Sequence, residues 1–325
     1  MKKYISAMAL IPVLMAVLPQ PAGNPTAELK SRFIEAKLYL PDPINGYYRG
    51  TRFDWAGQIS DLKCNGHTYF GQWFEKYSPT LHDAIMGPVE EFGPLGYDET
   101  KPGESFIMIG IGALKKPEEK SHQRFGYYEI SDNGKWSIKK KKDEIQFIHK
   151  LTHKGYSYEY IKTIRLLKES PVMEITHTLK NKGNLPIKTN VYNHNFFVMD
   201  DQQIGPGFIV TFPFRLSGDC PDFKDIAIVK DNTIRFNRTI NGTETVFCGT
   251  LKGFSNDSKD FNVKIENTDT GAGVSITADK PLSKLYFWAS IKTLCPETFI
   301  DMDIQPGKEF SWKLAYEFYS FDKRK

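Results

Sequence analysis

Apolar and polar residues alternate along much of the chain, beginning at residues 34–40, where every second residue is apolar. The alternation stops at the Pro-Asp-Pro run at 41–43, which is typical of a turn. It returns at 145–151 and, after Gly155, at 156–166. Because successive side chains of a strand point to opposite faces, this period of two predicts strands with one buried face. Two such segments on either side of a glycine turn predict an antiparallel hairpin.

The same period continues through the second half of the chain, where polar turns separate the segments. Further alternating segments lie at residues 173–179, 187–191, 263–265, 273–277, 285–289 and 310–318. No window of about 12 residues or more carries a helical stripe of apolar positions. The pattern predicts an all-β fold, and the length of 325 residues favours a large antiparallel β-sandwich over a small barrel. Since no linker or repeat interrupts it, we expect one domain over residues 24–325.

The composition is that of a folded chain without a strong charge bias. Lysine and arginine together number 43 and the acidic residues 39, which leaves a formal net charge of +4. This balance argues against a nucleic-acid partner, and 40% hydrophobic residues argue against wholesale disorder. Phenylalanine, tryptophan and tyrosine make up 14% of the chain. Their rings are typical of a β-rich core, and they also offer flat faces on which sugar rings stack.

The N-terminus carries the pattern of a secretory signal peptide. Two lysines follow Met1, an uncharged and mostly apolar run covers residues 4–18, and prolines and small residues follow it. The run is shorter than the roughly 20 apolar residues that cross a bilayer, so we expect a signal peptide over residues 1–23. An uncleaved N-terminal anchor is the alternative. Cleavage would leave a secreted or periplasmic protein with no stable membrane insertion.

The cysteines do not form a metal signature. Cys64, Cys220, Cys248 and Cys295 are too widely spaced for paired Cys-x-x-Cys ligands. Export permits disulfides, but a chain of this length buries enough surface without them. We therefore expect buried free thiols, and one disulfide is the alternative.

A first polar and aromatic cluster interrupts the strand pattern at residues 47–55. Clusters of this kind are where a rigid β scaffold displays its function. Arg52 can donate to sugar hydroxyls or carboxylates through its planar guanidinium, and Trp55 can provide a stacking face. An Arg–Asp pair that holds a loop is an equal alternative.

A second cluster covers residues 82–93 and contains His82 and two adjacent acids, Glu90 and Glu91. Adjacent residues of a strand point to opposite faces of the sheet. We therefore expect at most one of the two glutamates to face any given pocket.

A histidine and a glutamate in the second half of the chain are candidates for proton transfer. His194 lies among amides and aromatic residues at the end of a predicted strand. An imidazole can donate a proton near neutrality, and a buried histidine held by neighbouring amides is the simpler alternative. Glu297 stands between apolar residues, next to Pro296. Because a carboxylate is costly to bury unless it is used or paired, Glu297 is a candidate for chemistry or for a structural ion pair.

Three motifs, taken in order, resemble those of the galactose mutarotase-like superfamily, the aldose 1-epimerases and their relatives. They are Asn-His-Asn-Phe-Phe at 193–197, Cys-Pro-Glu at 295–297 and Ile-Gln-Pro-Gly-Lys-Glu at 304–309. The segments at 48–55 and 87–93 resemble a secreted subgroup of epimerase-like proteins. The similarity covers roughly residues 28–320. It implies a β-supersandwich with a sugar cleft on one broad sheet face, and a mechanism that needs no cofactor. No residue is assigned as a metal ligand.

The resemblance also implies roles for individual residues. His194 matches the general acid that protonates the ring oxygen of a hexopyranose, and Glu297 matches the base that deprotonates the anomeric hydroxyl. Relatives hold the sugar with an arginine and a second histidine, and no segment here reproduces that motif letter by letter. The candidates for binding the sugar are Arg52, His82, Glu90, Asn193 and Trp55.

The leading hypothesis is therefore an aldose 1-epimerase that acts on a small-molecule carbohydrate. A non-catalytic carbohydrate-binding protein of the same fold is the alternative from a different class. A lyase or hydrolase that acts on a polysaccharide is a third hypothesis, but the catalytic helical domain of such enzymes has no counterpart in this sequence.

Overall fold

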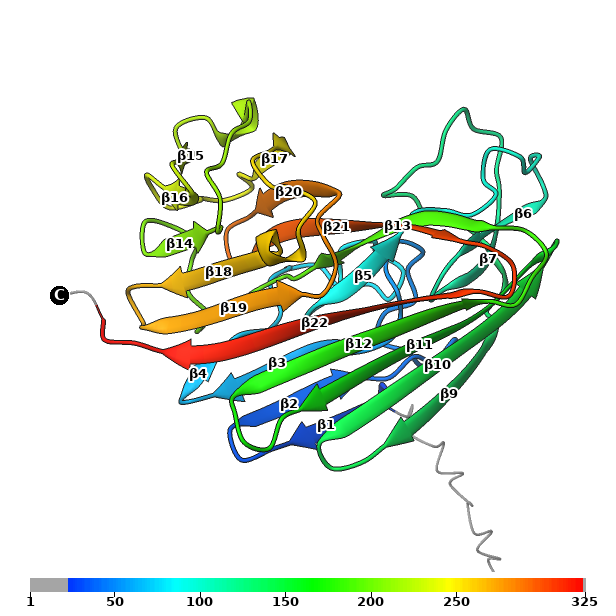
Figure 1. Ribbon diagram of the computed structural model, residues 1–325, viewed down its shortest axis with the longest axis horizontal. Helices are drawn as coiled ribbons and strands as arrows, with labels where there is room; N and C mark the ends of the chain where they lie inside the picture. Colours follow the sequence, from blue (N-terminus) through cyan, green and yellow to red (C-terminus); the bar gives the residue numbers. More distant parts are fainter. Residues whose placement is uncertain (1–22, 324–325) are drawn as a thin grey trace, which may run out of the picture.

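The computed structural model describes residues 23–323, so the predicted signal peptide lies outside the described residues except for Gly23. Strands dominate the described part, and its only helices are two 3-10 turns, Pro221–Phe223 and Ser258–Asp260. Within residues 23–323, no helix has the length and apolar character needed to cross a membrane. The predicted all-β fold is confirmed (Figure 1).

The largest layer is a ten-stranded antiparallel sheet in the order β15-β16-β14-β18-β19-β22-β12-β11-β10-β9 (Figure 1). In that order the strands are Ala227–Lys230, Thr233–Phe236, Phe208–Thr211, Asn262–Asn267, Ala272–Ala278, Glu309–Ser320, Val172–Asn181, Tyr156–Leu166, Glu144–His153 and Lys135–Lys140. The hairpin predicted around Gly155 is confirmed as the antiparallel pair β10–β11. Alternate residues of both strands are buried, as the period of two predicts.

A five-stranded antiparallel sheet in the order β17-β20-β21-β13-β5 forms the second layer. In that order its strands are Val246–Leu251, Lys284–Ala289, Leu294–Ile304, Ile187–His194 and Val89–Phe92. One face of this sheet meets the ten-stranded sheet. Phe92 of β5 packs edge-on against Tyr160 of β11 and Trp312 of β22, at ring-centroid separations of 5.4 and 6.2 Å. The predicted antiparallel sandwich is thereby confirmed.

Two smaller sheets complete the described fold. One has the order β1-β2-β3-β4, with strands Thr26–Lys30, Ile34–Tyr39, Gln58–Cys64 and His67–Thr68. The other has the order β6-β7-β8, with strands Ser105–Met108, Gly112–Lys115 and Ile130–Asp132. The strand predicted at 34–40 is β2, which ends at Tyr39, shortly before the Pro-Asp-Pro run. Residues 116–129 form an irregular loop between β7 and β8.

Burial of alternate side chains holds the layers together, as β22 illustrates. Trp312, Leu314, Tyr316 and Phe318 are all buried, while the residues between them are exposed or half-buried. Each large apolar side chain removed from water contributes about 1.5–3 kcal/mol. A shift of the strand by one residue would place this entire set on the other face, so burial also fixes the register.

The cysteines correct one expectation from the sequence. Cys220 and Cys248 form a disulfide with a Cα–Cα distance of 4.9 Å, whereas Cys64 and Cys295 are free and buried. The prediction that all four cysteines are free thiols is therefore wrong, and the alternative of one disulfide is correct. The two bonded residues are 28 positions apart and meet because β17 packs against the turn at Pro221–Phe223. Spacing along the chain does not reveal that contact.

Candidate active site

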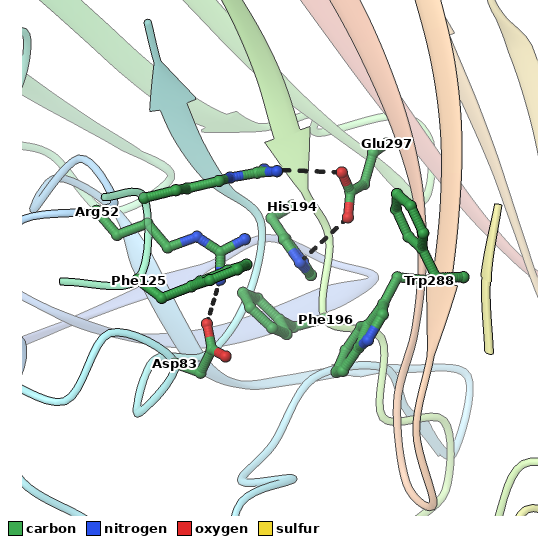
Figure 2. Close-up of a pocket in the computed structure, with 9 residues that line it drawn as sticks. Arg52, Asp83, Phe125, His194, Phe196, Trp288 and Glu297 are labelled. Carbon is green, nitrogen blue, oxygen red and sulfur yellow. Dashed lines mark hydrogen bonds and ion pairs between the residues drawn. The ribbon is translucent and has the colours of Figure 1, made fainter. Parts of the chain in front are cut away.

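His194 and Glu297 lie on neighbouring strands of the five-stranded sheet. Asn193 of β13 pairs with Thr298 of β21, so the next step of the antiparallel ladder brings His194 beside Glu297. His194 Nε2 is 3.5 Å from Glu297 Oε1, and each residue is only 3% exposed. Figure 2 shows the two side chains pointing toward each other. The sheet register therefore forms one acid–base pair from two distant parts of the chain.

A stack of aromatic rings fixes the plane of the His194 imidazole. The Phe196 ring lies 3.8 Å from it at an interplanar angle of 13°, and Trp73 stacks against Phe196 at 5.1 Å. Phe196 has a φ of 45°, and its backbone N–H donates to Cys295 Sγ at 3.1 Å. A bulky residue in the left-handed region is strained, and such strain clusters at functional sites. The hydrogen bond and the ring stack hold Phe196 in that conformation and thereby orient His194.

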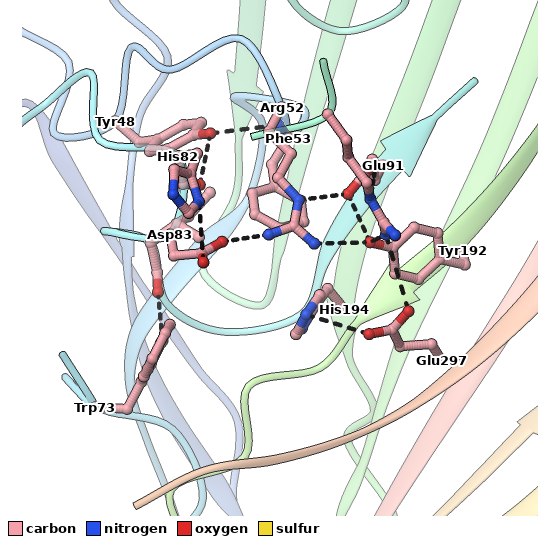
Figure 3. A network of polar contacts seen from close by, with 12 residues as sticks. Tyr48, Arg52, Phe53, Trp73, His82, Asp83, Glu91, Tyr192, His194 and Glu297 are labelled. Carbon is pink, nitrogen blue, oxygen red and sulfur yellow. Dashed lines mark hydrogen bonds and ion pairs between the residues drawn. The ribbon is translucent and has the colours of Figure 1, made fainter. Parts of the chain in front are cut away.

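Two arginines converge on Glu91 beside the pair. Arg52 Nε donates to Glu91 Oε2 at 2.7 Å, and Arg124 Nε donates to Glu91 Oε1. Tyr192 OH donates to Glu91 Oε2 at 2.6 Å. Figure 3 shows Arg52 between Asp83 on one side and Glu91 and Tyr192 on the other. Because charge-assisted bonds hold the planar guanidinium groups from several sides, the cations have fixed positions.

The two arginines, Asp83, the His194–Glu297 pair and four aromatic side chains line a cavity of about 420 Å³. Its lining residues are Arg52, Asp83, Arg124, Phe125, His194, Phe196, Phe247, Trp288 and Glu297. The volume lies within the range of roughly 300–1,000 Å³ that is common for small-molecule pockets. In Figure 2, Phe125 and Trp288 lie on opposite sides of the His194–Glu297 pair. Hydrogen-bonding groups next to flat apolar rings suit a sugar, which has both hydroxyl groups and apolar C–H faces.

Burial and the nearby cations set the protonation of the pair. Burial lowers the pKa of His194 well below its usual value, and Arg52 and Arg124 lower it further. Burial raises the pKa of Glu297 to about 7, although both arginines act in the opposite direction. In the resting site the imidazole is therefore neutral, and near pH 7 the titrating proton lies on the carboxyl group. This differs from the expectation that the imidazole carries the proton near neutrality, because an imidazolium would be buried close to two cations.

Glu90 and Asn193 do not line the pocket. Glu90 forms an ion pair with Lys162, and its Oε1 lies 2.8 Å from both His177 Nε2 and Asn193 Nδ2, all buried. The prediction that only one adjacent glutamate faces the pocket side is confirmed, but that glutamate is Glu91. The choice of Glu90 and Asn193 as sugar-binding residues is corrected, because strand parity turns both toward the interior of the sandwich.

The ionic cluster around Lys162 is fully enclosed. Lys162 Nζ donates to Ala56 O at 2.8 Å and lies 3.8 Å from Asp54 Oδ2. Burial raises the pKa of Asp54 to about 7. Burial also acts on Glu90, but the charge of Lys162 and the contact with His177 outweigh it and hold the pKa of Glu90 at about 2. The ammonium group of Lys162 therefore provides the positive charge that compensates the buried carboxylate of Glu90.

Trp55 and His82 also lie outside the pocket lining. Trp55 is 1% exposed and its Nε1 donates to a backbone carbonyl at 2.9 Å, so its ring belongs to the core and offers no stacking face. His82 is half-buried and contacts two lining residues, with Nδ1 2.9 Å from Asp83 Oδ2 and its ring 5.3 Å from that of Phe125. Of the five predicted binding residues, Arg52 alone lines the pocket.

Several lining residues were not assigned to the site from the sequence: Asp83, Arg124, Phe125, Phe196, Phe247 and Trp288. Arg124 and Phe125 come from the irregular loop at 116–129, which has no alternation of apolar and polar residues that could indicate where its side chains point. Trp288 belongs to a predicted strand. The alternation along that strand indicates which face of the sheet Trp288 occupies, but it does not indicate that this face carries the pocket. Among residues 23–323, no three His, Cys, Asp or Glu side chains gather as a metal-binding group.

No protein-family model matches the chain, and no curated protein matches it. Several solved structures match the chain. A galactose mutarotase-like protein from Clostridium acetobutylicum matches with a TM-score of 0.55 at 12% identity, covering 91% of this chain and 95% of that chain. A galactose mutarotase related enzyme from Lactobacillus acidophilus gives 0.53 at 13% identity, with coverages of 91% and 98%. A GalM/aldose epimerase homologue from C. elegans gives 0.55 at 11% identity, with coverages of 92% and 100%.

The layers and the pocket thus define a large antiparallel β-sandwich with a pocket on one face of its five-stranded sheet. Its fold is the galactose mutarotase-like fold. At identities of 11–13%, this likeness shows the fold alone.

Proposed function

We propose that the protein is an aldose 1-epimerase, which interconverts the two anomers of a sugar through His194 and Glu297. The observation that carries the proposal is the 3.5 Å approach of His194 Nε2 to Glu297 Oε1 in a pocket with polar and aromatic walls. The names of two neighbouring structures, a galactose mutarotase related enzyme and an aldose epimerase homologue, support it.

The chemistry explains why two converging groups suffice. The ring oxygen and the anomeric hydroxyl of an aldose are bonded to the same carbon, C1, so the proton donor and the proton acceptor must lie close together. One group protonates the ring oxygen and the other deprotonates the hydroxyl. The bond between C1 and the ring oxygen then breaks, the aldehyde rotates, and the reverse transfers close the other anomer. Each positioned transfer typically contributes about 10²- to 10⁴-fold to the rate.

The pair needs one proton in order to perform both transfers. The resemblance gives the acid role to His194, whereas the resting site stores the proton on Glu297 because its pKa is raised to about 7. In both assignments His194 and Glu297 together hold one titratable proton, and only its position differs, because the two groups titrate as a coupled pair. We therefore assign activity to the state in which His194 and Glu297 together hold one proton. Arg124, whose Nη2 is 3.9 Å from Glu297 Oε2, stabilises the carboxylate that remains once the proton has left.

A non-catalytic carbohydrate-binding protein is the second candidate. The exposed rings of Phe125 and Phe247 at the pocket favour it, because such rings hold a sugar whether or not protons move. Polarimetry on freshly dissolved single anomers of glucose, galactose, xylose and glucuronic acid, with calorimetry on the same sugars, separates the two. Faster anomer exchange than in buffer supports the epimerase. Binding without acceleration of any bound sugar refutes it and leaves the binder.

We also propose that the protein is secreted or periplasmic. The signal-like N-terminus supports this location, and so does the Cys220–Cys248 disulfide, because such bonds persist in oxidising compartments. Mass spectrometry of the protein from separated cell fractions tests it. We expect a chain without residues 1–23 outside the cytoplasm, and a full-length cytoplasmic chain would contradict the proposal.

A further inference from the structure

Two aromatic rings of the pocket are much more exposed than the acid–base pair. Phe125 is 58% exposed and Phe247 is 38% exposed, compared with 3% for His194 and Glu297. The pair therefore lies deep in the pocket, and the two rings lie near its mouth. A sugar whose C1 meets the pair must turn the opposite side of its ring toward that mouth.

The sheet register places Phe247 two strands away from Glu297. Phe247 on β17 pairs directly with Trp288 on β20, and β20 separates β17 from β21, which carries Glu297. Trp288 and Phe247 therefore stand side by side on the face that carries the pocket. Neighbouring strands are about 4.8 Å apart, so two strand spacings of about 10 Å separate Phe247 from the glutamate strand. A second linked ring extends a ligand from the pair toward this strand.

Phe125 provides a second exposed face from the loop at 116–129. The Arg52 guanidinium carbon lies 4.8 Å from the centre of the Phe125 ring, which holds the ring in place. Most of the remaining ring surface is open to solvent. Exposed aromatic faces are costly to leave in water and bind the apolar C–H faces of sugars.

The Phe247 side of the pocket is also tethered. Cys248 follows Phe247 on β17, points to the opposite face and is bonded to Cys220. The disulfide thus ties the strand that carries Phe247 to the segment before the turn at Pro221–Phe223. A ring on a tethered strand is preorganised for binding and loses little entropy when a ligand stacks on it.

We propose that Phe247 and Phe125 form a second sugar subsite, and that the preferred ligand is a reducing oligosaccharide of at least two rings. This inference rests on the proposed function, since the reducing-end ring occupies the site of His194 and Glu297. The next ring toward the non-reducing end stacks on the exposed rings at the mouth. The reducing ring keeps its free anomeric hydroxyl at the pair, as anomer exchange requires.

The test compares sugars by calorimetry, so it does not depend on catalysis. Glucose and galactose are the single-ring probes, and cellobiose, maltose and lactose are the two-ring probes. We expect at least one disaccharide to bind wild-type protein about tenfold more tightly than the single rings, since one aromatic stack contributes about that factor. Phe247→Ala should abolish this advantage. Phe125→Ala should reduce it, and serves as the second variant.

Matched controls are available on the same fold. Ile228→Ala removes another exposed apolar side chain from an edge strand, and Tyr127→Ala removes a neighbouring exposed ring of the loop at 116–129. Both should keep the disaccharide advantage. Equal binding of one-ring and two-ring sugars, or an advantage that survives Phe247→Ala, would overturn the second subsite. Polarimetry with the same sugars judges the epimerase proposal separately, because sugars that bind and are not converted refute only that proposal.

Discussion

Arg124 Nη2 lies 3.9 Å from Glu297 Oε2, so an irregular loop holds a cation against a buried carboxyl group of the sheet. The same cation lowers the pKa of His194. The loop therefore tunes both members of the acid–base pair without belonging to either strand that carries them.

Replacing Arg124 should move the pH dependence of the pair. Arg124→Gln removes a positive charge that lowers the pKa values of Glu297 and His194, so both values should rise, by about one unit. Both limbs of the pH profile of kcat/KM should then move to higher pH, even if the maximum falls through weaker binding. Arg238→Gln is a suitable control, because Arg238 forms ion pairs with Asp225 and Glu244 instead. Limbs that stay in place would show that Arg124 does not tune the pair.

Wild-type kcat/KM should follow a bell-shaped pH profile, because activity requires one proton on the pair. At low pH, His194 takes up a second proton, and its lowered pKa places this limb well below 6.5. As pH rises, Glu297 loses the remaining proton, so the alkaline limb should lie near its pKa of about 7. Because kcat/KM reports the ionisations of the free enzyme, initial rates measured from about pH 4 to about pH 9 test this profile directly. A rate that keeps rising through neutral pH would contradict the one-proton state.

The buried cluster should contribute strongly to stability. Lys162→Met removes the cation that compensates Glu90 and Asp54, both inaccessible to solvent. Breaking such a pair typically costs about 3–5 kcal/mol of the free energy of unfolding, which denaturant titration at pH 7 measures. Lys30→Met, at an exposed pair with Glu35, should cost less than about 1 kcal/mol. Equal losses in the two variants would mean that the enclosed cluster is not a structural ion pair.

The thiol count distinguishes the observed disulfide from the free thiols expected from the sequence. A thiol reagent should find no reactive group in the native protein, two after unfolding without reductant, and all four after reduction. Replacing both Cys220 and Cys248 with alanine should lower the free energy of unfolding by about 2–4 kcal/mol, because the loop between them is no longer closed in the unfolded chain. Detection of four thiols without reductant would rule out the bond.

The strands could be predicted from the sequence because they depend on local periodicity. The alternation at 145–151 and 156–166 reflects one buried face, and the structure has strands there. His194 and Glu297 were singled out by residue type and by the family resemblance of their motifs, and the structure places His194 Nε2 3.5 Å from Glu297 Oε1. The alternation and the motifs are both contained within a few consecutive residues.

The remaining site depends on relationships between distant segments. Period two shows that Glu90 and Glu91 point to opposite faces, but only the pairing of β5 with β13 shows that Glu91 shares a face with Tyr192. Trp55 has the chemistry of a sugar-stacking residue, yet its ring is enclosed by the core. Arg124 comes from a loop without a period. These placements follow from tertiary packing, which no local pattern encodes.

The central claim is that His194 and Glu297 act together on the anomeric centre, and polarimetry of three variants tests it most directly. His194→Ala, Glu297→Gln and the double variant should each lose at least a hundredfold in kcat/KM relative to wild type. The double variant should be little slower than either single variant, since one acid–base device has been removed in each case. Anomer exchange at the wild-type rate in both single variants would contradict the account.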